Sequence, residues 1–228
     1  MAISGIFGAM LFSMIKAAFL QNLKPAIALQ SFAVAIVLCY YLVPATLPAF
    51  MFFADLKAQY GIHYAMVSTA IFGGLLPFTY LFFSGKIERQ PIAQLLFYLV
   101  IWAWLGACVD TLYRFQGELF GHGTDIGTLA KKVAVDQFIY SAFYAAPFVA
   151  LMFLWKEQGF SYKRWRGALN KQIFTLNIPA NIASNWLVWI PAVTAIYSMP
   201  PALQIPLFNV VLCFYVLLLA VLNKEKSA

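Results

Sequence analysis

The sequence predicts an all-α fold, a polytopic bundle of about six transmembrane helices preceded by an N-terminal interfacial helix. Hydrophobic residues make up 63% of the 228 residues and charged residues only 10%, whereas soluble domains carry about 45–50% apolar and about 25% charged residues. The apolar residues form continuous runs of hydrocarbon length, and they do not alternate as the strands of a barrel do. Because backbone polar groups in lipid must bond within the chain, we expect these runs to be helices.

Each predicted span holds about 19–26 residues, which is enough to cross about 30 Å of hydrocarbon. The six spans are residues 31–53, 63–83, 91–109, 133–155, 173–198 and 202–222. They form one transmembrane domain, residues 31–222, followed by a basic C-terminal tail at 223–228. Proline within a span bends its helix, and we expect this at Pro44, Pro48, Pro77 and Pro147.

The first 23 residues form a separate predicted segment. Apolar residues recur there at helical spacing, but polar residues such as Ser13, Lys16 and Gln21 interrupt them. This pattern favours an amphipathic helix lying in the plane of the membrane interface. A seventh span is the alternative, and it would place the N-terminus on the other side.

Basic residues are distributed unevenly between the two predicted sides of the membrane. Eleven fall on the side of the N-terminus, and four, Lys57, Arg114, Lys131 and Lys132, fall on the other. Because basic loops remain on the cytoplasmic or matrix side, this split supports six spans. It also predicts that the longest loop, residues 110–132, is solvated on the less basic side.

Two polar residues, Asp136 and Gln137, lie inside the apolar run 133–155. A carboxylate at a helix centre costs about 2.5–3.5 kcal/mol in a membrane, and less near the interface, so it usually faces the bundle and has a partner. Lys131 and Lys132 are candidate partners, and Lys132, four residues earlier, lies on the same face of the helix. A polar contact between helices is the favoured interpretation, and a proton or solute relay is the alternative.

Three asparagines, Asn177, Asn181 and Asn185, follow one another at a spacing of four and therefore share one stripe of a helix. Such a stripe joins helices by hydrogen bonds or lines a wet path. On another span, Gly73 and Gly74 belong to a strip of small residues that lets helix backbones approach closely. That strip indicates packing.

No enzyme signature is present. The sequence has no nucleophile elbow, no phosphate-binding glycine loop and no zinc-protease helix. Its three cysteines, Cys39, Cys108 and Cys213, all fall in apolar segments and are expected to be unpaired. We therefore predict a non-enzymatic protein with no catalytic residue, metal or cofactor, and with bound phospholipids. The basic residues lie in short loops between spans, so nucleic acid is not an expected partner.

The second half of the chain resembles a known family. The run from Lys131 to Gln137 is similar to the K-x-x-x-D-Q entry of a span in the Mpv17/PMP22 family of mitochondrial and peroxisomal membrane proteins. Asn185, Trp186, Trp189 and Pro191 are similar to that family's N-Y-x-x-W-P signature, with Ile190 inserted before the proline. The resemblance covers residues 131–222. It implies a mitochondrial inner or peroxisomal membrane and channel-like behaviour.

Two functions follow as hypotheses. The first is an accessory or structural subunit packed in a larger inner-membrane complex of the respiratory chain or ATP synthase type, since the spans carry few ionisable groups and most are apolar on every face. The second is a small-solute or ion channel or transporter, with Asp136 and the stripe Asn177, Asn181 and Asn185 lining the path. The mitochondrial inner membrane is the expected location, and a peroxisomal or bacterial inner membrane is the alternative.

Overall fold

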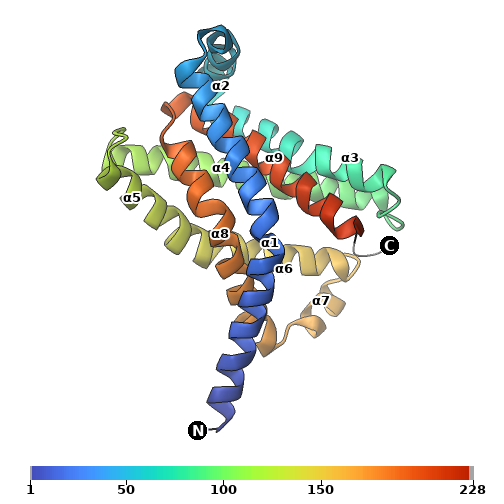
Figure 1. Cartoon of the computed structure of the whole chain (residues 1–228). Helices are drawn as coiled ribbons and strands as arrows, with labels where there is room; N and C mark the ends of the chain where they lie inside the picture. The colour runs from blue at the N-terminus through green and yellow to red at the C-terminus, as the bar shows by residue number, and fades with distance from the viewer. Residues whose placement is uncertain (1, 226–228) are drawn as a thin grey trace. The chain divides into compact units, whose positions relative to one another are not determined.

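The computed structural model describes residues 2–225, with the side chains between residues 8 and 217 apart from a few before residue 26. Over these residues the chain is helical with short turns and contains no strand (Figure 1). The predicted all-α class is therefore confirmed. The chain divides into two compact units: unit 1 comprises Met1–Ala28 and Ala134–Pro191, and unit 2 comprises Leu29–Val133 and Ala192–Ala228.

The helices follow one another with few long connections. In order they are α1 (Ala2–Leu42), η1 (Pro44–Thr46), α2 (Leu47–Thr69), η2 (Ala70–Leu75), α3 (Leu76–Phe83), α4 (Pro91–Phe120), α5 (Ile126–Ala134), η3 (Val135–Ala145), α6 (Ala146–Glu157), α7 (Tyr162–Ala168), η4 (Ile173–Asn177), α8 (Ile178–Tyr197) and α9 (Pro201–Glu225).

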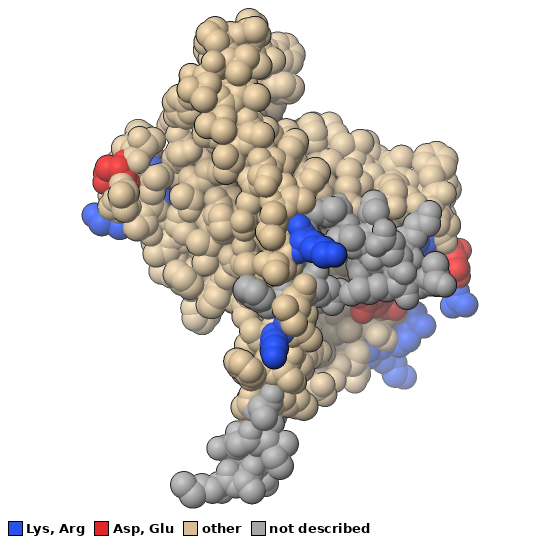
Figure 2. All heavy atoms as spheres, in the orientation of Figure 1, with Lys and Arg blue, Asp and Glu red and all other residues tan. Residues whose placement is uncertain are grey.

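Three helical runs within the described residues are long and apolar enough to cross a membrane: Pro44–Phe83, Pro91–Phe120 and Ile126–Glu157. Two shorter apolar helices, Ala26–Leu42 and Pro201–Leu217, accompany them. Figure 2 shows one face of the molecule, on which Lys, Arg, Asp and Glu form only small separate groups. These features indicate a membrane protein, and the count of six spans stays a prediction.

The N-terminal half differs from the predicted boundaries. Residues 2–42 form one helix of 41 residues, so the predicted segment 1–23 is not a separate helix, and many of its side chains lie outside the described residues. The predicted span 31–53 is interrupted, because α1 ends at Leu42 and a 3-10 turn begins at Pro44. The Thr46 hydroxyl donates hydrogen bonds to the carbonyls of Cys39 and Val43 at 2.9 and 2.7 Å, which stabilises this break.

A second break falls inside α2 at Gly61, whose φ of 52° and ψ of −124° are not helical. Glycine adopts this backbone conformation at little cost, whereas residues with a Cβ rarely do. The first part of α2 is thereby separated from the part that continues through η2 and α3. That second part matches the predicted span 63–83.

The predicted loop 110–132 is wrong over most of its length. Helix α4 continues to Phe120 and α5 begins at Ile126, so only residues 121–125 connect them. Buried residues recur at helical spacing past the end of the apolar run, for example at Leu105, Val109, Tyr113 and Gln116. This face continues to pack after hydropathy falls, and the helix continues with it.

Each of the three π-helical segments is followed by a proline. Segments η2, η3 and η4 end at Leu75, Ala145 and Asn177, and Pro77, Pro147 and Pro179 follow two residues later. Proline cannot donate its backbone hydrogen bond and its ring collides with the carbonyl four residues earlier. A locally widened helix accommodates that ring, which is how these prolines modify their helices.

Candidate functional site

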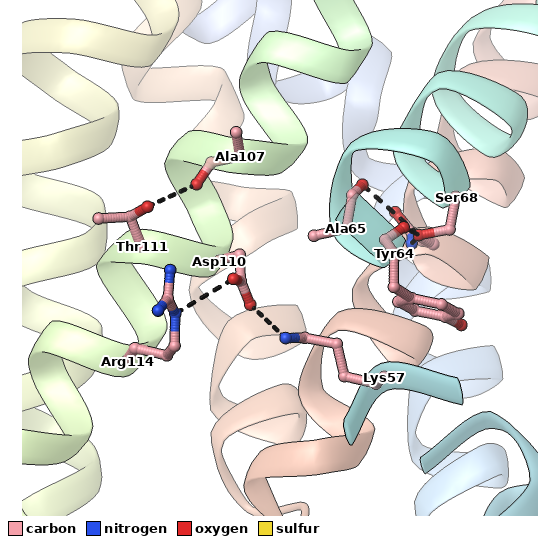
Figure 3. Close-up of polar contacts among 9 residues, drawn as sticks. Lys57, Tyr64, Ala65, Ser68, Ala107, Asp110, Thr111 and Arg114 are labelled. Atoms are coloured by element: carbon pink, nitrogen blue, oxygen red, sulfur yellow. Dashed lines mark hydrogen bonds and ion pairs between the residues drawn. The ribbon is translucent and has the colours of Figure 1, made fainter. Parts of the chain in front are cut away.

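An ion pair is buried inside unit 2. Lys57 Nζ of α2 lies 2.8 Å from Asp110 Oδ1 of α4, and the two side chains are only 11% and 2% exposed (Figure 3). Arg114, one turn further along α4, places its Nε 3.2 Å from Asp110 Oδ2, but its side chain is 60% exposed. The Arg114 contact is within ion-pair distance without hydrogen-bond geometry, since Oδ2 accepts no hydrogen bond from the described residues. Lys57 is therefore the main partner of Asp110.

A second polar group joins α2 to α9 within the same unit. The Thr69 hydroxyl donates to Asn209 Oδ1 at 2.7 Å, and Asn209 Nδ2 donates to Ser68 Oγ at 2.7 Å. Ser68 in turn donates to the Tyr64 carbonyl at 2.6 Å. All three polar side chains are buried. Because each hydrogen-bonding atom named here has a partner, this network connects the two helices without leaving an unsatisfied polar group.

A glycine brings α4 against α2 between these two groups. A Cβ added at Gly106 would meet the Ala65 carbonyl oxygen and would lie 2.7 Å from Thr69 Oγ1. Gly106 and Asp110 are one turn apart, so they lie on the same side of α4. The close approach at Gly106 thus holds Asp110 on the side of α4 that faces Lys57.

A third group lies further along the same face of α4. Gln116 Nε2 donates to the Tyr197 hydroxyl at 2.7 Å, and the Tyr113 ring lies 4.9 Å from the Tyr197 ring. Lys132 Nζ of α5 lies 5.7 Å from the centre of the Tyr197 ring. Asp110, Tyr113 and Gln116 follow one another along α4 at intervals of three residues.

The predicted residues Asp136 and Gln137 are buried in unit 1. Gln137 Nε2 donates to Asp136 Oδ1 at 2.7 Å, and Trp186 Nε1 donates to the Gln137 carbonyl at 3.0 Å. Of the two candidate partners of Asp136, Lys132 has its Nζ near the face of the Tyr197 ring, within unit 2. Within unit 1, the hydrogen bond from Trp186 to the Gln137 carbonyl is a polar contact between α8 and η3.

The predicted asparagine stripe divides into two parts. Asn177 and Asn181 are exposed, and Asn185 is half-buried with its Nδ2 3.5 Å from Ser141 Oγ. Only Asn185 of the three thus makes a side-chain hydrogen bond to another helical segment within unit 1.

The predicted small residues Gly73 and Gly74 lie in η2. A Cβ at Gly73 would lie 2.8 Å from the side chains of Leu212 and Trp102, and one at Gly74 would lie 3.0 Å from the Tyr98 carbonyl oxygen. Neither position has room for a side chain, so helices α4 and α9 pack directly on this segment.

Sequence reasoning missed Lys57 and Asp110, because both were placed in solvated loops. The usable signal was the helical spacing of buried positions on α4, which runs through Asp110 without a break. Within the described residues no group of three His, Cys, Asp or Glu side chains is arranged to hold a metal ion.

No family model, curated protein or solved structure matches the chain. The function is therefore argued from the geometry of the polar groups in unit 2 and from the residues that form them.

Proposed function

We propose that the chain is a non-enzymatic integral membrane protein that passes a small solute or ion through the helices of unit 2. The observation that carries the proposal is the buried pair of Lys57 and Asp110. Ionisable residues among membrane helices are costly, and they usually mark pathways, relays or sites of coupling. The scarcity of such groups in the sequence favoured a packing role, and this pair removes that argument.

The order of the polar groups along α4 supports a path. Asp110 pairs with Lys57 at one level, and Gly106, one turn away, packs on Thr69, which belongs to the network with Asn209. Charged and neutral polar side chains therefore succeed one another between α2, α4 and α9. In this proposal the Lys57–Asp110 pair closes the path between α2 and α4.

The break at Gly61 provides a way to open it. Lys57 lies four residues before Gly61, in the first part of α2, whereas Ser68 and Thr69 lie in the second part. A change in backbone angles at one hinge residue is enough to move the segment that carries Lys57. Loss of the ion pair would then accompany movement of the first part of α2 away from Asp110.

Flux measurements in liposomes test this proposal. Purified chain should release small ions or solutes from loaded vesicles, and Asp110→Asn should change the rate or the charge selectivity by at least about tenfold, since a buried charge dominates the local field. Arg114→Gln is the matched control, because its exposed guanidinium faces the same carboxylate at longer range. Wild-type vesicles that remain as tight as protein-free vesicles would refute the proposal.

An accessory subunit of a larger inner-membrane complex is the second candidate. The observation that favours it is the exposed apolar surface of the run Ile126–Glu157, on which Phe143 is 81% exposed and Ile139 is 59% exposed. Large exposed apolar patches mark contacts with protein or lipid. Extraction in mild detergent separates the two candidates: a subunit migrates in a large complex of fixed stoichiometry, and a lone 25.5 kDa chain does not support it.

We also propose that the chain is a distant member of the Mpv17/PMP22 family, located in a mitochondrial inner membrane, or in a peroxisomal or bacterial inner membrane. The support is the similarity of residues 131–222 in sequence. Fractionation of cells that express the tagged chain, with markers for each membrane, tests the location.

A further inference from the structure

We propose that Lys132, Gln116 and Tyr197 form a binding site for a protonated phosphate group, supplied by inorganic phosphate or by a phosphomonoester lipid headgroup. The site lies in unit 2, where α4, α5 and the end of α8 contribute one residue each. It is separate from the pair of Lys57 and Asp110, and its test does not require that anything passes through the protein.

The first observation is a buried ammonium group that lacks a counterion. Lys132 is only 2% exposed, and among the described residues no ion pair involves it. Its Nζ lies over the face of the Tyr197 ring, 5.7 Å from the ring centre. A buried charge is normally paired, because removing it from water is costly. An anion at this position would provide the missing charge.

The second observation is an acceptor oxygen without a donor. Gln116 is fully buried, and its Nε2 donates to the Tyr197 hydroxyl at 2.7 Å. Its Oε1 accepts no hydrogen bond from any described residue. Buried amide oxygens are nearly always satisfied, and a lone one costs about 1–3 kcal/mol. A ligand that donates a hydrogen bond would satisfy this oxygen.

The two needs together select the ligand. Lys132 requires a group that accepts hydrogen bonds and carries negative charge, and Gln116 Oε1 requires a group that donates one. Hydrogen phosphate has both, since it carries charged oxygens and a hydroxyl. Sulfate has the same shape and charge but no proton at neutral pH. The site should therefore distinguish phosphate from sulfate.

The burial of both side chains limits the size of the ligand. Lys132 is 2% exposed and Gln116 is fully buried, so the site would take a group no larger than a single phosphate and would hold it away from water.

The test uses the full chain purified in detergent and titrated calorimetrically with sodium phosphate or sodium sulfate. We expect phosphate to bind at least about tenfold more tightly than sulfate, since the loss of one buried hydrogen bond to an unsatisfied partner has about that effect. Lys132→Met should weaken phosphate binding about tenfold to a hundredfold, because it removes a charge-assisted hydrogen bond. Lys131→Met is the matched control, since Lys131 is the exposed neighbour, and its binding should equal that of the wild type.

A second variant guards against a fault in folding. Gln116→Glu offers Lys132 an internal carboxylate, so it should keep the melting temperature of the wild type or raise it while it abolishes phosphate binding. Absence of phosphate and lipid binding in the wild type would overturn the site, and so would full binding in Lys132→Met. Equal affinity for phosphate and sulfate would overturn the role of Gln116 Oε1.

Nanodiscs distinguish the two sources of phosphate. Discs of phosphatidylcholine alone are compared with discs that also contain phosphatidic acid, and the readout is the melting temperature of the wild type and of Lys132→Met. A rise that requires phosphatidic acid and Lys132 assigns the site to a lipid headgroup. A rise with inorganic phosphate in phosphatidylcholine discs assigns it to free phosphate. No rise in either arm would count against the site.

Discussion

Removing one partner of the Lys57–Asp110 pair should destabilise unit 2 strongly. Lys57→Met keeps most of the volume of the lysine stem but leaves the Asp110 carboxylate, which is 2% exposed, without its 2.8 Å partner. Breaking a buried ion pair costs about 3–5 kcal/mol, because the remaining charge is desolvated without compensation. Arg114 reduces this loss only partly, since its guanidinium is mostly exposed and its contact with Asp110 lacks hydrogen-bond geometry.

The double variant Lys57→Met with Asp110→Leu separates the cost of an orphaned charge from the value of the pair. Replacing both partners of a buried ion pair by apolar residues is often neutral or stabilising. We therefore expect the double variant to recover most of the stability lost by Lys57→Met alone. The coupling energy of the cycle should exceed about 1 kcal/mol, which is the usual upper limit for exposed pairs.

Stability is measured as the denaturation midpoint of the full chain in one detergent, with helix content followed by circular dichroism. The control is Lys131→Met, which removes an exposed charge from α5 and should change stability by less than about 0.5 kcal/mol. A Lys57→Met variant as stable as this control would refute the reasoning, since it would show that Asp110 is solvated or protonated. Additive single and double variants would refute the direct pairing of the two side chains.

Three further predictions concern a close helix contact, a buried hydrogen-bond network and the titration of a helix cap. Gly106→Ala should destabilise the fold by about 1–3 kcal/mol, because its Cβ would lie 2.7 Å from Thr69 Oγ1. Gly167→Ala in α7, where no atom lies within 4 Å of the new Cβ, is the control and should be neutral or slightly stabilising in the same unfolding assay. Asn209→Ala should cost about 1–3 kcal/mol of stability, because it leaves Thr69 and Ser68 without their shared partner. Asn181→Ala, which changes an exposed residue of α8, is the control and should cost less than about 0.5 kcal/mol. Hydrogen bonds from Thr128 lower the pKa of Asp125 below its ordinary value of 3.8. The cap that Asp125 provides to α5 is therefore fully present above pH 3.8 and is lost as the pH falls through the lowered pKa. Amide exchange at Thr128 should increase in that range in the wild type and should show no such pH dependence in Asp125→Asn.

Hydropathy predicted the helical class because lipid leaves the backbone few alternatives, but it located helix ends poorly. It ended the third span at Val109, where apolar residues stop, whereas α4 continues to Phe120. Packing with other helices extends the buried face beyond the apolar run, and Asp110 is tolerated because Lys57 reaches it. Hydropathy averaged along the sequence includes the cost of burying a charged residue, but it contains no information about a partner on another helix that offsets this cost.

The breaks in the helices were only partly predictable. A π-helical segment precedes Pro77, Pro147 and Pro179, whereas Pro191 and Pro206 lie inside α-helices. The break at Gly61 carried no comparable signal, because a glycine in a sequence is compatible with a helix and with a turn. Asp136 and Gln137 are buried, whereas Asn177 and Asn181, which share their spacing with Asn185, are exposed. Spacing predicts a shared stripe and does not reveal which side of the helix is covered.

The structure shows that some of the four basic residues assigned to the less basic side are buried and not solvated. Of the four, Lys57 and Lys132 are buried, and Arg114 faces Asp110, so Lys131 is left as the exposed lysine of that group. Two of the four basic residues are therefore withdrawn from water, which the sequence count of eleven to four does not take into account. The six-span topology stays a prediction. The two buried lysines therefore have different partners: Lys57 neutralises the carboxylate of Asp110 on α4, and in our proposal Lys132 binds an anion from outside the chain.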